Sequence, residues 1–276
     1  MRVSLLVATY NWPSALALVL DAVRAQHELP NEVLIADDGS GTPTRDLIAR
    51  VQSDFPVPLH HVWHEDRGFR AGAIRNRAIA RATGEYVLQI DGDIVLHPGA
   101  VAAHKRRAKR GTFVQGSRAL LSEERTAALM QTGLTSLGPF SAGLSHRLNA
   151  WYAPGLASLS GGTRDTIKRI RGCHIAFWRD DLVRVNGYDE TYEGWGREDS
   201  DLTLRLGHAG VIRRNLKFSA VAFHLWHAQN SRDALDRNSA RLEEARRERR
   251  VRATKGLDQY LHSTLSSTPA PATPEG

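Results

Sequence analysis

The chain has 276 residues, and 41% of them are hydrophobic, which is enough to build a full core in one large domain or two closely joined halves. No uninterrupted apolar stretch approaches membrane-spanning length, and the single Cys173 excludes an internal disulfide. The formal net charge of +7 is compatible with a nucleic-acid partner, but no recognisable nucleic-acid-binding motif accompanies it, so we expect no such partner.

The basic residues concentrate in three runs, at residues 105–110, 168–171 and 241–252. Such runs usually form solvated helix faces, and attraction to anionic lipid or to a phosphorylated acceptor is the next interpretation. The apolar bias of residues 1–20 is interrupted by Asn11 and Pro13, and no cleavage site follows it. We therefore expect a cytoplasmic protein, with a peripheral position on the inner face of the membrane as an open alternative.

The first 90 residues alternate between short apolar runs and helical patterns. Strand, helix, strand, helix in this order predicts right-handed crossovers and a mainly parallel sheet flanked by helices, a Rossmann-like α/β fold. The loops after the strands then collect along one edge of the sheet. The expected strands are residues 3–9, 32–36, 59–64 and 86–90, and the expected helices begin near Pro13 and cover residues 71–82.

Beyond a further strand at residues 112–115 the pattern loosens, and residues 120–171 show no clear period. This stretch is typical of an insertion or lid. Order returns at residues 172–178, and the chain ends in a charged, helix-forming segment and a tail rich in Ser, Thr and Pro. The predicted units are residues 1–118, an insertion or lid at 119–171, a second half of the same domain at 172–232, a charged helix at 233–262 and a disordered tail at 263–276.

Asp91 and Asp93 follow the apolar run at residues 86–90, with Gly92 between them. One intervening residue places both carboxylates on the same side of an extended strand, where they repel unless a cation such as Mg²⁺ or Mn²⁺ neutralises them. An isolated Asp-x-Asp is more often a solvated turn. The later Gly194–Asp199 segment, with the two histidines His224 and His227, favours a metal-diphosphate site instead.

Residues 64–76 and 80–93 resemble the inverting family 2 glycosyltransferases of the GT-A fold. Residues 172–202 resemble the carboxyl-terminal module shared by galactosyltransferases and related N-acetylhexosaminyltransferases. The resemblance covers roughly residues 3–230, and its motifs arrive in the family's order. It implies a GT-A fold with a carboxyl-terminal acceptor-side module, and an enzyme that passes a sugar from a UDP-sugar to an acceptor hydroxyl.

By this resemblance, Thr9, Tyr10 and Asp38 would hold the uridine, although Asp38 in an Asp-Asp-Gly-Ser turn is also a common turn residue. Arg70 presents a planar fork suited to phosphate oxygens, and its alternative is a salt bridge with a neighbouring acidic residue. Asn76 would bond the nucleotide or fasten its helix to a loop.

The resemblance also implies that Asp91 contacts the ribose or donor sugar and that Asp93 is a direct metal ligand. The metal would neutralise the charge that grows on the departing nucleotide. His227, with His224 as a further candidate, would complete the coordination, and imidazole ligands favour Mn²⁺ over Mg²⁺. The alternative for each histidine is a structural role.

Asp199 is the expected general base, because an acceptor hydroxyl must lose its proton as it attacks the anomeric carbon. Glu198 would orient an acceptor or donor hydroxyl, and the alternative for both carboxylates is capping of a helix N-terminus. Trp195 would lie under a sugar ring, with Gly194 allowing a close approach of the ligand, unless the indole packs into the core.

One departure from the family concerns His174, which stands where relatives often carry Asn and is expected to touch the sugar. We therefore predict a metal-dependent inverting enzyme that moves a hexose or N-acetylhexosamine from a UDP-sugar to a saccharide or lipid-linked saccharide of a cell-envelope polysaccharide or lipopolysaccharide. A sugar nucleotidyltransferase is a competitor, but residues 8–11 lack its glycine- and lysine-bearing phosphate loop. A non-catalytic carbohydrate-binding protein on the same fold is another.

Overall fold

An eight-stranded sheet forms the centre of the computed structural model, which describes residues 1–157, 163–164, 170–228 and 231–261. Its strand order is β3-β2-β1-β4-β10-β6-β11-β9. The strands are β1 (Val3–Thr9), β2 (Glu32–Asp37), β3 (Leu59–Trp63), β4 (Tyr86–Asp91), β6 (Thr112–Gly116), β9 (Thr163–Arg164), β10 (His174–Trp178) and β11 (Ile212–Leu216).

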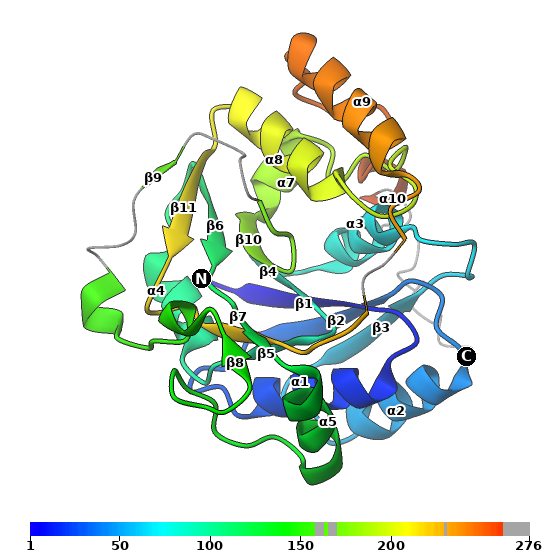
Figure 1. Ribbon diagram of the computed structural model, residues 1–276. Helices are drawn as coiled ribbons and strands as arrows, with labels where there is room; N and C mark the ends of the chain where they lie inside the picture. Colours follow the sequence, from blue (N-terminus) through cyan, green and yellow to red (C-terminus); the bar gives the residue numbers. More distant parts are fainter. Residues whose placement is uncertain (158–162, 165–169, 229–230, 262–276) are drawn as a thin grey trace, which may run out of the picture.

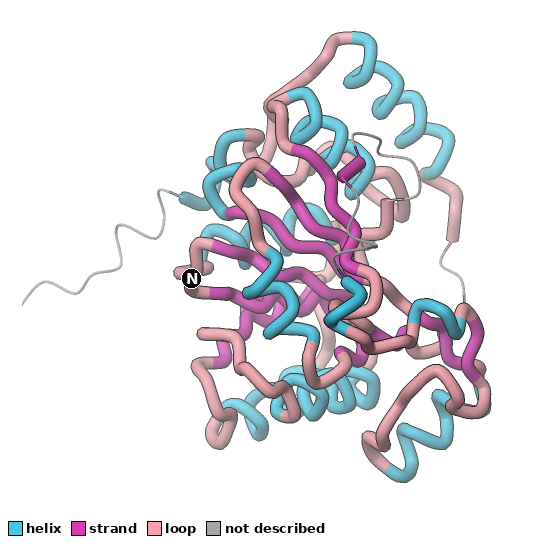
Figure 2. The backbone as a smooth tube through the Cα atoms, turned by 90° about the vertical axis from the view of Figure 1, so that its left-hand side faces the viewer, coloured by secondary structure: helices cyan, strands magenta, loops and turns pink. Residues whose placement is uncertain are grey.

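Strands β1, β2, β3 and β4 run parallel to one another, as the sequence predicted. Helices cover both faces of the sheet, and alternation along β1 shows why. Leu5 and Val7 pack in one cluster with α1 (Pro13–Arg24) and α2 (Thr42–Gln52), whereas Leu6 packs in another with α3 (Ala71–Arg81) and α8 (Glu198–His208). The expected mainly parallel α/β sheet flanked by helices is therefore confirmed (Figures 1 and 2).

The second half of the chain enters the same sheet. β10 lies antiparallel between β4 and β6, and β11 continues parallel to β6. A smaller sheet has the order β5-β12-β7-β8 and joins β5 (Ile94–Leu96), β7 (Ala119–Leu121), β8 (Leu144–Ser145) and β12 (Ala222–His224). Residues 119–121, at the start of the predicted insertion or lid, thus form a strand that the sequence did not predict.

The remaining helical elements lie around these sheets. Among the described residues they are α4 (Ala100–Arg107), α5 (Glu123–Thr132), α7 (Arg179–Arg184), α9 (Leu235–Arg247), α10 (Asp258–Leu261) and two 3₁₀ turns, η1 (Arg147–Asn149) and η2 (Pro154–Leu156). Within the described residues, no helix has the length and apolar character needed to cross a bilayer. The tail predicted to be disordered, 263–276, lies outside the described residues.

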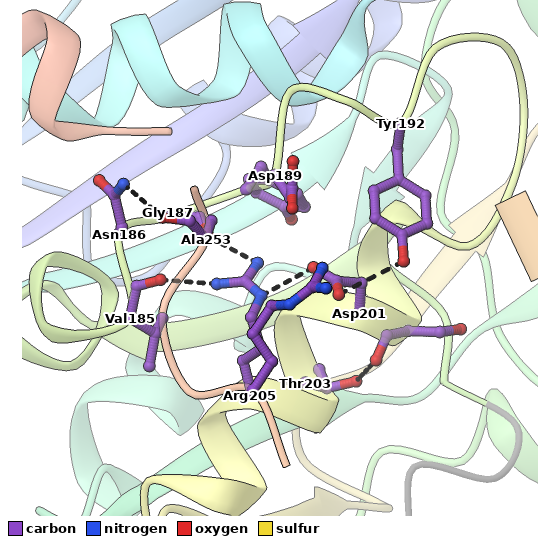
Figure 3. A network of polar contacts seen from close by, with 12 residues as sticks. Val185, Asn186, Gly187, Asp189, Tyr192, Asp201, Thr203, Arg205 and Ala253 are labelled. Carbon is purple, nitrogen blue, oxygen red and sulfur yellow. Dashed lines mark hydrogen bonds and ion pairs between the residues drawn. The ribbon is translucent and has the colours of Figure 1, made fainter. Parts of the chain in front are cut away.

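A buried ion pair fixes α8, the helix whose first turn carries the predicted catalytic carboxylates (Figure 3). The Arg205 guanidinium is fully buried and donates to Asp201 at 2.7 Å. Its other nitrogens donate to the carbonyls of Val185, at 2.6 Å, and Gly187, at 2.8 Å. Because every partner is satisfied, the network ties α8 firmly to the turn that follows α7.

Arg205→Met is expected to lower the free energy of unfolding by about 3–5 kcal/mol, because it leaves the Asp201 carboxylate buried without its partner. Urea unfolding followed by circular dichroism measures the change. Arg246→Met is the matched control, since Arg246 forms an exposed i,i+3 pair with Glu243 that contributes less than about 1 kcal/mol. Equal, small losses in the two variants would contradict the structural role of the buried pair.

Candidate active site

A cavity of about 1460 Å³ lies along the edge of the main sheet where β1, β2 and β4 end. The N-terminal turn of α8 and the residues preceding β10 close its other side. Ten of the fourteen predicted site residues line it: Thr9, Tyr10, Asp38, Asp91, Asp93, Trp195, Glu198, Asp199, His224 and His227. The cavity therefore draws on both halves of the chain.

The pairing of β5 with β12 brings the two candidate histidines to Asp93. His224 stands opposite Ile94 in this register, and the amide of Leu225 donates to the Asp93 carbonyl at 2.9 Å. The Asp93 carboxylate then lies 3.3 Å from Nε2 of His227 and 3.6 Å from Nε2 of His224. One ligand atom from each of the three residues falls within 4.8 Å of the others, which suits a single cation.

The chemistry of this triad also fits a metal ion. Oδ1 of Asp93 is buried and has no hydrogen-bond partner in the described structure, which leaves it available to a cation. Burial raises the pKa of Asp93 to about 8, with the Asp91 carboxylate adding to the shift, so a positive charge is needed to hold it ionised. Burial lowers the pKa of His224 to about 4, which keeps its imidazole neutral and able to ligate.

The sequence analysis missed Arg75, which lies at the centre of the acidic groups. This buried guanidinium, on the inner face of α3, is 2.9 Å from Asp91 and 3.5 Å from both Glu198 and Asp199. Three carboxylates converging in a buried site require a cation, and Arg75 neutralises part of their charge. Its helical spacing from Ala71 and Ala78, both buried, was the available signal for an inward-facing side chain.

Glu198 and Asp199 occupy the first turn of α8, and both also line the cavity. Burial raises the pKa of Glu198 to about 7, and the adjacent Asp199 adds to the shift. Burial also raises the pKa of Asp199, against the opposing effect of Arg75. The Asp199 carboxylate packs directly on Gly172, so a side chain at that position would have to displace it.

Asp38 is held firmly on the β2 side of the cavity. Its Oδ1 lies 2.6 Å from Nε2 of His64, and its Oδ2 accepts from the amide of Arg70 at 2.9 Å. The local turn is instead closed by Asp37, which accepts from the Ser40 amide. Asp38 is thus fixed by partners distant in the sequence, and its carboxylate lines the cavity.

Arg70 and Asn76 lie outside the cavity lining. The Arg70 guanidinium donates to the backbone carbonyl of Glu65 at 2.5 Å. The Asn76 amide is fully buried and exchanges two hydrogen bonds with the backbone of Tyr188, at 2.9 and 2.8 Å. Asn76 therefore fastens α3 to the segment before α8, which is the alternative that the sequence left open.

His174 and Gly194 also lie outside the cavity lining. His174 is 1% exposed and lies 3.1 Å from the buried His104, so the expected contact with a sugar is wrong. Gly194 has φ +75° and donates from its amide to the Phe69 carbonyl, so its role is to form the turn that presents Trp195. Another cavity residue missed from sequence is Arg118, whose guanidinium donates to Cys173.

Comparison with known families adds the decisive observation, because the family model "Glycosyl transferase family 2" matches residues 4–171. The chain belongs to glycosyl transferase family 2. A second model, described as "N-terminal domain of galactosyltransferase", matches residues 156–227, the region that supplies the α8 carboxylates and His224. Both parts of the resemblance seen in the sequence are thereby confirmed.

Proteins with a named activity are also similar to this family 2 chain, at low identity. Validoxylamine A glucosyltransferase of Streptomyces hygroscopicus subsp. limoneus is 24% identical over 75% of the chain and 48% of its own length. Hyaluronan synthase of Pasteurella multocida is 22% identical over 80% of the chain and 24% of its own length. The chain therefore spans about half or less of these relatives.

Among solved structures, S. aureus TarS 1–349 in complex with UDP is similar, with a TM-score of 0.59. The match covers 96% of this chain and 71% of that one, at 16% identity. At this identity the likeness concerns the fold alone, and it agrees with the GT-A architecture expected from the sequence.

Proposed function

We propose that this family 2 chain is a metal-dependent, inverting glycosyltransferase that moves a hexose or N-acetylhexosamine from a UDP-sugar to a saccharide acceptor. The observation that carries the proposal is one cavity that holds both a cation-ligand triad, around Asp93, and a buried carboxylate pair, Glu198 and Asp199. Arg75 and Asp91 lie between these groups. The triad suits a cation bound to a donor diphosphate, and the carboxylate pair suits an acceptor hydroxyl.

The donor side of the proposal rests on the residues of the first 118 positions. Tyr10 and the fixed carboxylate of Asp38 are suited to a uracil or ribose, whose N–H and O–H groups donate. Two imidazoles and one carboxylate would hold Mn²⁺ in preference to Mg²⁺. When bound, this ion supplies Lewis-acid neutralisation of the diphosphate leaving group. The solved TarS structure with UDP supports the choice of nucleotide.

The proposed reaction needs one displacement. The acceptor hydroxyl oxygen attacks the anomeric carbon while its proton passes to Asp199, and the bond between that carbon and the diphosphate oxygen breaks with its electron pair on the diphosphate. Glu198 orients the acceptor or donor hydroxyl. Arg75 keeps the carboxylates in place and offsets their mutual repulsion. Because no covalent sugar-enzyme intermediate intervenes, the anomeric configuration inverts.

The acceptor side is proposed from Trp195, whose indole is 37% exposed in the cavity wall with Arg232 above its ring. A flat, partly exposed aromatic face in such a position suits a sugar ring. Relatives that carry the names of hyaluronan and chondroitin synthases support a polysaccharide acceptor. We therefore propose a saccharide or lipid-linked saccharide of the cell envelope, such as a polysaccharide or lipopolysaccharide precursor, with residues 119–171 contributing to its recognition.

The pH dependence of kcat/KM is expected to show an acidic limb that lies above the ordinary pKa range of an aspartate. Burial raises the pKa values of Glu198 and Asp199, so these groups stay protonated to higher pH, and a protonated base accepts no proton. The rate therefore rises with pH through this range. Glu198→Gln removes a neighbouring negative charge and should move the acidic limb of Asp199 to lower pH. A limb at the same pH in both proteins would contradict the assigned coupling.

A donor panel tests the proposed function most directly. Purified protein with Mn²⁺ is incubated with different UDP-sugars, and UDP release is measured with and without candidate saccharides. Acceptor-dependent UDP release and an inverted anomeric linkage, seen by NMR, are the expected results. Release of pyrophosphate from UTP and a sugar 1-phosphate would instead indicate a nucleotidyltransferase. Binding of UDP-sugar without any release would indicate the non-catalytic alternative.

A further inference from the structure

Four large apolar side chains protrude from the stretch between β8 and β9 and from the loop just before β8. Phe140 is 84% exposed, Leu148 79%, Leu156 51% and Trp151 43%. The Phe140 and Trp151 rings contact each other edge to face, with centroids 5.8 Å apart. We call these four residues the apolar ridge. Scattered exposed apolar residues are ordinary, but a group of large ones on one short stretch indicates an interaction surface.

The backbone beneath the ridge is anchored. The Asn149 side chain donates to the carbonyl of Arg118 at 2.9 Å, which ties η1 to the loop before β7. Tyr152 turns inward and stacks on His97, with ring centroids 4.0 Å apart. Its neighbour Trp151 consequently faces outward. The exposure of the ridge thus follows from fixed local structure, and this makes it a permanent feature of the surface.

Arginines flank the ridge on two sides. At the η2 end, Arg106 and Arg107 from the last turn of α4 line a second cavity, of about 440 Å³, together with Pro154. The Arg106 side chain is 56% exposed and lies 3.5 Å from the exposed Glu28 carboxylate, so its pairing with Glu28 must yield to an anionic headgroup. On the other side, Arg147 lies in η1, donates to the Pro139 carbonyl and also lines the large active-site cavity. The ridge therefore combines apolar side chains with cations at its border.

We infer that the apolar ridge docks this protein on an anionic phospholipid bilayer. Aromatic and leucine side chains enter the boundary between headgroups and acyl chains, and flanking arginines attract anionic headgroups. This charge complementarity favours a membrane over a neutral partner surface. Since Arg147 borders both the ridge and the active-site cavity, docking would bring the cavity toward the membrane surface, where a lipid-linked acceptor is presented. That last consequence, unlike the docking itself, rests on the proposed function.

Vesicle flotation with the full chain tests the inference without any turnover. The vesicles contain phosphatidylcholine alone or an equal mixture with phosphatidylglycerol. The protein should float with the anionic vesicles and detach as salt rises. Phe140→Ser combined with Leu148→Ser should weaken partitioning about tenfold, through lost apolar burial. Arg106→Glu combined with Arg107→Glu should weaken it by at least about tenfold, through lost attraction.

Each double variant has a matched control elsewhere on the surface. Arg246→Glu with Arg247→Glu changes the same charge at the end of α9, where Arg246 also forms one exposed ion pair. Ile212→Ser with Val251→Ser removes two other exposed apolar side chains. Thermal melting confirms that every variant is folded. The inference is overturned if the wild-type protein does not float with anionic vesicles, or if the control variants weaken flotation equally. It is also overturned if the ridge variants float normally, including the case in which they lose only saccharide binding.

Discussion

Asp199→Asn is expected to lower kcat for sugar transfer by about 10³-fold or more, because an amide takes no proton from the acceptor hydroxyl. Binding of UDP in the presence of Mn²⁺ should remain within about twofold of wild type, since Asp199 and Asp91 contact different nitrogens of Arg75 and the substitution preserves shape. Acceptor-dependent UDP release measures the first quantity, and calorimetric titration with UDP measures the second.

Asp236→Asn is the matched control for this variant. Asp236 also lies in the first turn of a helix, α9, but outside the lining of the active-site cavity. It should transfer sugar at the wild-type rate. Near-normal turnover by Asp199→Asn would remove the base assignment, whereas a parallel loss of UDP binding would show that the change had disturbed the Arg75 cluster instead. The kcat of Glu198→Gln should lie between those of Asp199→Asn and Asp236→Asn, because Glu198 orients a hydroxyl and accepts no proton.

Asp93→Ala is expected to weaken Mn²⁺ binding by about 10²-fold or more. Loss of a group that only hydrogen-bonds to a metal ligand already lowers metal affinity about 10- to 100-fold, and Asp93 is itself a proposed ligand. The affinity for UDP should then lose its dependence on Mn²⁺, because the protein no longer holds the ion that links it to the diphosphate. Electron paramagnetic resonance reports free Mn²⁺ during titration, and UDP titrations with and without the metal report the coupling.

His227→Ala should have a smaller effect in the same direction, because Asp93 and His224 remain. Asp54→Ala, which removes an exposed carboxylate paired with Arg24, is the control and should leave both affinities unchanged. A variant without Asp93 that still bound UDP more tightly with Mn²⁺ than without it would show that the triad is not the metal site. This outcome would leave the family assignment untouched, since that rests on the family-model match over residues 4–171.

The parts of the fold that could be predicted from sequence are those whose signal is local. The strands ending at Thr9, Asp37 and Asp91 are buried apolar runs of sufficient length, and their alternation with helices defines a parallel sheet. By contrast, β7 and β8 have three and two residues, too few for any periodicity to emerge. β7 pairs with β12, about a hundred residues later, and β8 joins the sheet only through β7.

The same distinction holds for the site. Asp93 and Asp199 stand in motifs that the chain carries intact, and the structure places both in one cavity. Arg75 and Arg118 escaped notice because their partners lie on segments far apart in the sequence. His174 was misjudged for a related reason, since position within a motif does not reveal on which side of a strand a ring is buried.

The insertion of β10 between β4 and β6 has a further consequence for protein engineering. A fragment that ends at residue 171 would lack β10, so β4 and β6 would both lose a hydrogen-bonded neighbour. Their exposed, unpaired edges could then pair with other chains. The two recognisable family segments are therefore not exchangeable cassettes. Chimeras with relatives should therefore retain β10 together with everything before it, so that β4 and β6 keep their shared neighbour.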